Sequence, residues 1–227
     1  MTNNSIHSIK IIKTTKAMKK FIVLLVSMLL LIPAASNAQN SNALSKALKK
    51  EYKSKMKEFK KDGWKNFGST RSLEVVLLKH YEEMNEGKGE VVGLASVSDA
   101  KHKNLLKSTA EVNAFTTYAR NSGMALRGRV VADLGLTDEE KSEFEHVYQA
   151  YEGSVEKEIK GELKPSFSVI RETSDNHIEM QMFYLVDEDA ATKARIRAFE
   201  NAAKESEIAQ KYANKVSDFI REGFNNK

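Results

Sequence analysis

Hydrophobic residues recur at helical spacing along much of the chain, and this pattern predicts several helices. The first is predicted over residues 41–62, where spacings of three and four place one apolar stripe of Leu44, Leu48, Tyr52, Met56 and Phe59. A second helix is predicted over residues 71–85, and a third over residues 101–121 with Gly123 as its stop. Residues 125–135 are interpreted as a loop with a short strand.

Two further helices are predicted in the second half of the chain. Thr137 and Glu140 have the spacing of a capping box, so a helix begins behind them. The last helix is predicted to run unbroken over residues 189–222, about 50 Å at 1.5 Å per residue. A helix of that length exceeds the needs of a small domain. We therefore expect part of it to pair with another helix, with the helix of residues 41–62 as the candidate.

Alternating residues predict the strands. Phe167, Val169 and Arg171 alternate with polar residues, and a turn at residues 174–176 leads to a return strand with a second alternating set: Ile178, Met180, Met182, Tyr184 and Val186. His177, Glu179 and Gln181 point away from that set. Residues 90–98 are predicted to form a further strand. The expected class is therefore α+β, a small antiparallel sheet packed on one face by several helices, with long N- and C-terminal helices.

The segment over residues 18–38 has the three parts of a secretory signal. Met18 to Lys20 is basic, residues 21–32 are apolar apart from Ser27, and Ser36 to Ala38 offers small residues for cleavage. An apolar core of this length is shorter than the roughly 20 residues of a membrane span. The sequence thus predicts that residues 1–38 contain a signal peptide. Met18 is the expected start of translation, so the peptide itself would begin there. It also predicts a basic amphipathic helix at residues 39–67, and an α+β domain at residues 68–227 with no transmembrane span.

Removing this segment changes the charge. Residues 1–38 contain five lysines and no acidic residue, so 31 of the 36 basic residues remain against all 31 acidic ones. A neutral mature chain argues against nucleic acid as a partner, because nucleic-acid binding draws on surplus positive charge. The chain has no cysteine, and therefore neither disulfides nor a lipidated cysteine. We expect a soluble protein released into the periplasm or the medium.

Residues 39–67 hold nine lysines and three acidic residues, and this leaves two interpretations open. In the first, a solvated helix packs its apolar stripe on the domain, because the acidic remainder of the chain can receive this basic arm. In the second, the helix is a basic arm for an anionic membrane surface or wall polymer.

The search for chemistry assigns no catalytic, cofactor-binding or metal-binding residue, and no cofactor is expected. The four histidines of the mature chain form no paired metal motif: His80, His102, His146 and His177. Glu143 and His146 are half of a di-iron motif that lacks its second copy. Asp187 and Asp189 are interpreted as helix-capping residues. The glycines of "GKGEVVG" precede a predicted strand, so they are interpreted as a loop and not as a phosphate cradle.

One resemblance covers about residues 90–190. An alanine-rich helix with Ala110, Ala114 and "YAR" leads to a helix ending in "VEKEIKGEL", and a strand, a turn and "MFYLVDEDAA" follow. This resembles the Lpp-twenty family of bacterial surface lipoproteins. The resemblance implies a compact α+β module and a non-enzymatic envelope protein, without catalytic residues. Members of that family begin with a lipidated cysteine, where this sequence has Gln39, so it does not support anchoring.

Three functions follow as hypotheses. The leading one is a non-catalytic envelope or secreted protein that acts through a protein partner, self-association or a structural role. The second is an exported hydrolase with a site assembled from distant residues, for instance around His177, Glu179 and Gln181. The third is peripheral binding of an anionic membrane or wall polymer through the lysine-rich helix.

Overall fold

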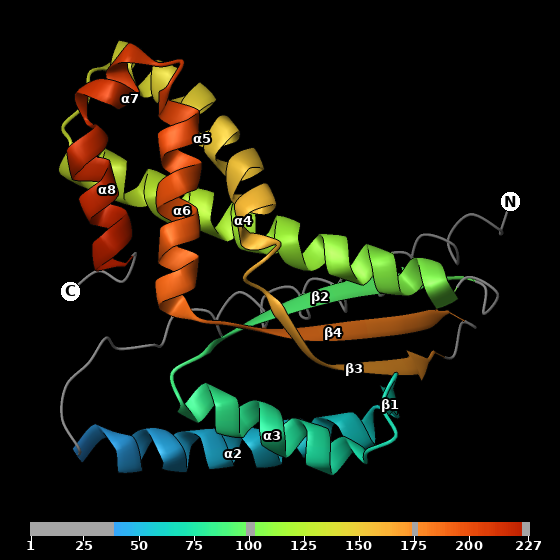
Figure 1. The fold of residues 1–227 in the computed structure, drawn as a ribbon. Coiled ribbons are helices and arrows are strands. Elements are labelled where there is room, and N and C mark those ends of the chain that lie inside the picture. Colours follow the sequence, from blue (N-terminus) through green and yellow to red (C-terminus); the bar gives the residue numbers. More distant parts are fainter. Residues whose placement is uncertain (1–38, 99–102, 174–176, 224–227) are drawn as a thin grey trace, which may run out of the picture. The chain divides into compact units, whose positions relative to one another are not determined.

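The computed structural model describes residues 39–98, 103–173 and 177–223. The predicted signal peptide, His102 and the predicted turn at residues 174–176 lie outside these ranges. The described residues form one compact unit, built on a four-stranded antiparallel sheet of order β1-β3-β4-β2 (Figure 1). Its strands are β1 (Lys65–Phe67), β2 (Gly89–Val97), β3 (Lys164–Glu172) and β4 (Ile178–Val186).

Helices cover both faces of this sheet (Figure 1). One face carries α2 (Gln39–Lys61) and α3 (Leu73–Asn85), and the other carries α4 (Lys103–Asp133), α5 (Asp138–Ile159), α6 (Glu188–Ala203), α7 (Glu207–Lys211) and α8 (Ala213–Glu222). None of the helices in the described ranges is long and apolar enough to cross a membrane. The α+β class is confirmed, whereas the expectation that helices cover only one face is wrong.

Two separate cores explain the double covering. On the α4 side, Met180, Met182 and Tyr184 of β4 share one core with residues of α4, α5 and α6. On the α2 side, Phe183 and Phe167 stack at a ring-centroid distance of 4.3 Å, and Phe59 of α2 meets both edge-on. Because β4 is buried on both faces, it forms the centre of the domain.

The β3–β4 hairpin is confirmed, but its faces differ from the prediction. Phe167 pairs with Phe183, and Arg171 with Glu179, across the two strands. Phe167 and Arg171 therefore share a face with Glu179, and not with the Ile178 set. The reason is the pairing register of the hairpin, which alternation within one strand does not determine.

The predicted end of the third helix at Gly123 is wrong, because α4 continues to Asp133. Leu126 and Val130 extend its buried stripe beyond the glycine. A Cβ at Gly123 would lie 2.2 Å from Oε1 of Glu152 on α5. The glycine thus leaves room for the Glu152 side chain of α5 and does not stop the helix. The predicted loop with a short strand at residues 125–135 is wrong for the same reason.

The C-terminal segment is also not one long helix but the three helices α6, α7 and α8. Ser206 caps α7 by accepting a hydrogen bond from the Ala209 amide, and the Gln210 side chain donates to the carbonyls of Ala203 and Lys204 at the end of α6. These bonds stabilise the break by satisfying free helix-end groups. The three helices pack on α4 and α5, so the predicted pairing with residues 41–62 is wrong.

Local signals were more reliable at two other places. The capping box is confirmed, since the Thr137 hydroxyl accepts from the Glu140 amide and the Glu140 carboxylate accepts from the Thr137 amide. "GWKNFG" has positive φ at Gly63 and Gly68, as expected for turns. Between them, however, the chain forms β1, which pairs with β3.

A buried arginine joins α6 to α4. The side chain of Arg195 is 5% exposed and donates hydrogen bonds to the Tyr118 hydroxyl, to the Thr192 hydroxyl and to the Glu188 carboxylate. The carboxylate offsets part of the cost of burying the guanidinium charge. This network fixes α6 relative to α4 on the face away from α2.

Buried tyrosines predict instability in alkali. Burial raises the pKa of Tyr148 to about 12, and the nearby Glu145 charge acts in the same direction. An unfolded tyrosine ionises near pH 10. The unfolded chain therefore loses these protons first, and the stabilising effect present below pH 10 disappears as the pH rises towards 12.

We expect the urea midpoint to fall steeply between pH 10 and pH 12, and less steeply in Tyr148→Phe. Unfolding curves followed by circular dichroism at pH 8, 10 and 11.5 measure this difference. Lysine deprotonation lowers the urea midpoint of both proteins alike. If the midpoint depended on pH identically in the unmodified protein and in Tyr148→Phe, the prediction would be contradicted.

Candidate functional site

His80 is the most deeply buried polar side chain on the α2 side of the sheet, with 0% exposure. Its Nδ1 lies 3.0 Å from Oγ of Ser166 on β3, and its Nε2 lies 2.7 Å from Oε2 of Glu90 on β2. Aromatic rings surround it, with the Phe167 centroid at 5.2 Å and the Tyr81 centroid at 5.7 Å. Three elements thus converge on one imidazole.

The two partners determine where the protons lie. An ionised carboxylate can only accept hydrogen bonds, so Nε2 of His80 carries the proton that faces Glu90. In the neutral imidazole Nδ1 is then an acceptor, and the Ser166 hydroxyl donates to it. This arrangement has a hydroxyl, a base and an orienting carboxylate in series.

A bulge brings Ser166 to the histidine. Pro165 pairs with Tyr184 and Phe167 pairs with Phe183, so Ser166 has no partner residue across the ladder. In a regular strand Ser166 and Phe167 would face opposite sides. Here both contact His80 from β3. The bulge therefore turns the serine towards α3, which is a known use of bulges.

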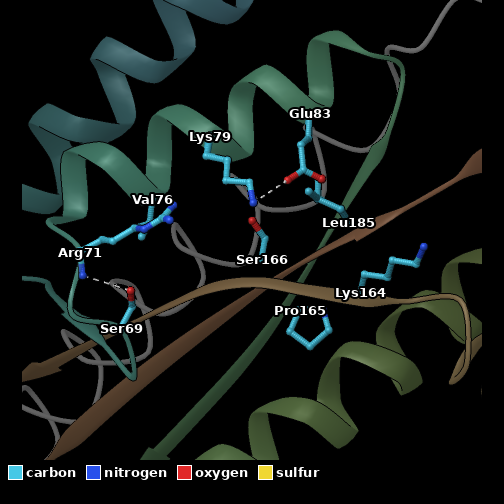
Figure 2. A pocket seen from close by; sticks show the side chains of 9 residues that line it. All are labelled: Ser69, Arg71, Val76, Lys79, Glu83, Lys164, Pro165, Ser166 and Leu185. Carbon is cyan, nitrogen blue, oxygen red and sulfur yellow. Dashed lines mark hydrogen bonds and ion pairs between the residues drawn. The ribbon is translucent and has the colours of Figure 1, made fainter.

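Ser166 also lines an open pocket of about 300 Å³ between α3 and β3. The lining residues include three cationic and two hydroxyl side chains: Arg71, Lys79, Lys164, Ser69 and Ser166. Lys79 of α3 and Ser166 of β3 point into the same space (Figure 2). The pocket is therefore positively charged and lined with hydrogen-bond donors.

The cations of the pocket differ in how far they are neutralised. Glu83 accepts from Lys88 at 2.7 Å and lies 3.8 Å from Lys79. The hydrogen bond from Lys88 holds the pKa of Glu83 below its ordinary value. Within the described ranges, the side chains of Arg71 and Lys164 form no ion pair. They lie on opposite sides of Ser166 (Figure 2), so each charge is separately available to an anion.

A second positive surface runs along α2. We call it the α2 lysine stripe, and it consists of Lys46, Lys49, Lys50, Lys53, Lys57, Lys60 and Lys61. All seven are exposed, and at about 100° per residue they fall within one sector of roughly 120°. The apolar side of α2, with Met56 and Phe59, packs in the core as the first interpretation predicted.

The acidic remainder of the chain does not receive these lysines. Among the seven, only Lys60 forms an ion pair within the described part of the chain, with Glu74 at 3.0 Å. Packing of the apolar side turns the stripe to solvent, as the first interpretation predicted for a solvated helix.

The polar strand residues of the hydrolase hypothesis do not form a common site. Glu179 accepts from Arg171 at 2.7 Å, and Gln181 is buried between Leu94 and Val169 of the neighbouring strands. His177 is exposed at the start of β4. The ion pair with Arg171 thus accounts for the position of Glu179, and packing within the sheet accounts for that of Gln181.

The other candidate residues take structural or exposed positions. Asp187 caps α6 by accepting from the Ala190 amide, as predicted. Glu143 and His146 are exposed on α5. No group of three or more histidine, aspartate or glutamate side chains in the described ranges could hold a metal ion. "GKGEVVG" leads into β2, where Gly89 is the first residue.

No sequence motif indicates the hydrogen-bonded series of Ser166, His80 and Glu90. In the sequence His80 is only one of four histidines outside any paired metal motif, and its partners lie on two separate strands. A serine beside a proline at the start of a strand was the one local signal. Comparison with protein-family models, with curated proteins and with solved structures gives no significant match for this chain.

Proposed function

We propose that this protein is an exported binding protein whose partner is a linear polyanion of the cell envelope, held along the α2 lysine stripe. The observation that carries the proposal is a row of seven exposed lysines, six of them without an ion pair in the described ranges. Rows of like charge repel each other, so an anion along the row would relieve that repulsion.

The helix dipole accounts for only part of the stripe. Lys60 and Lys61 lie in the last turn of α2, where the negative helix end favours cations. Lys46, Lys49 and Lys53 lie in the body of the helix and gain nothing from it. Lys46 and Lys61 are separated by about 22 Å at 1.5 Å per residue, which suits an extended polymer.

Burial of the apolar side favours a polymer over a membrane. A helix that lies in a bilayer surface inserts its apolar side among the lipids. Phe59 is 0% exposed in the domain core, so this side of α2 is already occupied. What remains for a partner is charge alone, and repeated carboxylate or phosphate groups match it.

The test compares two fourfold variants of equal charge. The stripe variant replaces Lys46, Lys49, Lys50 and Lys53 by glutamine, and the control variant replaces Lys107, Lys157, Lys193 and Lys215, which are exposed elsewhere. Binding to long-chain polyphosphate is measured at several salt concentrations. We expect the stripe variant to lower the slope of log K against log salt by about 3, at roughly 0.7 per lost contact.

The control variant should retain most of the salt dependence of the unmodified protein. Equal losses in both variants would show that net charge, and not the stripe, governs binding, and would contradict the proposal. Vesicles of phosphatidylglycerol form a second arm of the experiment, since stronger binding to vesicles than to polyphosphate would favour a membrane surface. A protein partner or self-association remains a prediction that native mass can test.

A further inference from the structure

We infer that Ser166, His80 and Glu90 form a hydrolytic site for carboxylic esters that carry an anionic group. This inference goes beyond polyanion binding on α2 and uses none of the stripe lysines. It rests on the hydrogen-bonded series, on the pocket that Ser166 lines and on the cations around that pocket.

The series has the geometry required of an activated nucleophile. Oγ of Ser166 and Nδ1 of His80 are 3.0 Å apart, and the carboxylate of Glu90 lies 2.7 Å from Nε2. These distances satisfy the reach of both a nucleophile–base bond and a base–orienter bond. Glu90 also selects the tautomer in which Nδ1 is free to take the serine proton.

The positions of the three residues suit their roles. Ser166 is half-buried at the pocket wall, so a substrate can reach its oxygen, whereas His80 behind it is shielded from solvent. The three residues come from two strands and a helix, which hold a site more rigidly than loops do. The bulge at Ser166 turns the hydroxyl out of the regular ladder and towards the base.

The charges of the pocket define the substrate class. Arg71 and Lys164 form no ion pair in the described ranges. Either side chain can therefore bind a carboxylate or phosphate group on the substrate. Lys79 points into the same space as Ser166 (Figure 2). Its ammonium group can stabilise the negative charge that develops on the carbonyl oxygen of the ester when Ser166 attacks the carbonyl carbon.

The reaction conserves atoms and protons. The Ser166 oxygen bonds to the ester carbonyl carbon while its proton passes to Nδ1 of His80. The bond from that carbon to the alcohol oxygen breaks, and the alcohol leaves with the proton from His80. Water then attacks the acyl-serine, gives one proton to His80 and releases the acid, after which the proton returns to Ser166.

The experiment uses a fluorophosphonate probe, which reacts with activated serines, on the full exported chain. We expect covalent labelling at Ser166, located by peptide mass spectrometry. Ser166→Ala should lose the label, and the matched control Ser168→Ala, in the same strand but outside the pocket, should keep it. Mapping the label on the unmodified protein decides the question even if Ser166→Ala does not fold.

Two further measurements separate catalysis from a structural role. Glu90→Gln presents an amide donor to Nε2 and permits the wrong tautomer, so labelling should slow at least tenfold. Glu90→Asp, which keeps a carboxylate acceptor, should recover part of that rate. Glu90 acts as a positioning residue here, and a merely structural role would not make the rate depend on whether position 90 carries a carboxylate or an amide.

Substrate preference tests the cations. The nitrophenyl ester of succinic acid should be hydrolysed with a lower KM than the neutral acetate ester, and Arg71→Gln with Lys164→Gln should remove that difference. A folded protein that takes no label at Ser166 would overturn the inference. Such a failure leaves the polyphosphate test untouched, since the two proposals share no residue.

Discussion

Replacing Gly93 by alanine is expected to lower the free energy of unfolding by roughly 3 kcal/mol or more, at the upper end of overpacking effects. Gly93 is buried in the middle of β2, directly beneath α4. A Cβ there would lie 1.9 Å from the carbonyl oxygen of Ala110 and 2.9 Å from Cβ of Ala114. Since the nearest of these atoms belongs to backbone, the clash can be relieved only by moving α4 away from the sheet.

Urea unfolding followed by circular dichroism measures this loss. The matched control is Gly128→Ala in α4, where an added Cβ meets nothing within 4 Å. Because alanine favours helix more than glycine does, this control should be neutral or stabilising by up to about 1 kcal/mol. A Gly93→Ala protein within about 1 kcal/mol of the unmodified one would contradict the close contact between β2 and α4.

Replacing Phe59 by alanine is expected to cost about 3–5 kcal/mol, the usual range for a buried phenylalanine. Phe59 is 0% exposed, with ring-centroid distances of 6.3 Å to Trp64 and 6.0 Å to Phe183. The amine of Lys55 also lies 5.1 Å from its ring centroid. Removal of the ring leaves a cavity between α2 and the sheet.

Urea titration again provides the measurement, with Val112→Ala as the control. Val112 is 52% exposed on α4, so its truncation should change stability by no more than about 0.5 kcal/mol. A Phe59→Ala loss below about 1 kcal/mol would mean that α2 is an appended arm whose packing contributes little to the fold.

Much of the fold follows from local pattern. Alternation predicted the β3–β4 hairpin, and the Thr137–Glu140 spacing predicted the start of α5, because each depends on residues close in sequence. The second covered face was also detectable. After Gln181 the apolar run continues without alternation from Met182 to Val186, which is typical of a strand buried on both faces.

Other features depend on contacts that sequence spacing does not encode. Gly123 resembles a helix stop, yet its role is close approach to Glu152 on another helix. The break between α6 and α7 depends on Gln210, whose side chain satisfies carbonyls six and seven residues earlier. Such tertiary and long-range bonds override the local helical periodicity of residues 189–222.

The candidate site was hidden for a related reason. Ser166, His80 and Glu90 come together only once β3 and β2 lie on either side of β4 and a bulge has turned the serine. The lysines of α2 were countable from the sequence, but their exposure depends on which side of the helix packs. Composition gave their charge, and only the fold shows that six of the seven form no ion pair within the described ranges.

The sheet order has a kinetic consequence. β4 lies at the centre, and its ladder with β2 joins Gly89 to Val186 and Val97 to Ile178. Neither core is complete without β4, so the residues before Ile178 cannot complete either core during synthesis. Pairings this distant in sequence also form slowly. The sequence predicts that the N-terminal segment directs export. In that case, the late synthesis of β4 would keep the polypeptide unfolded, and therefore competent for translocation, until β4 is made.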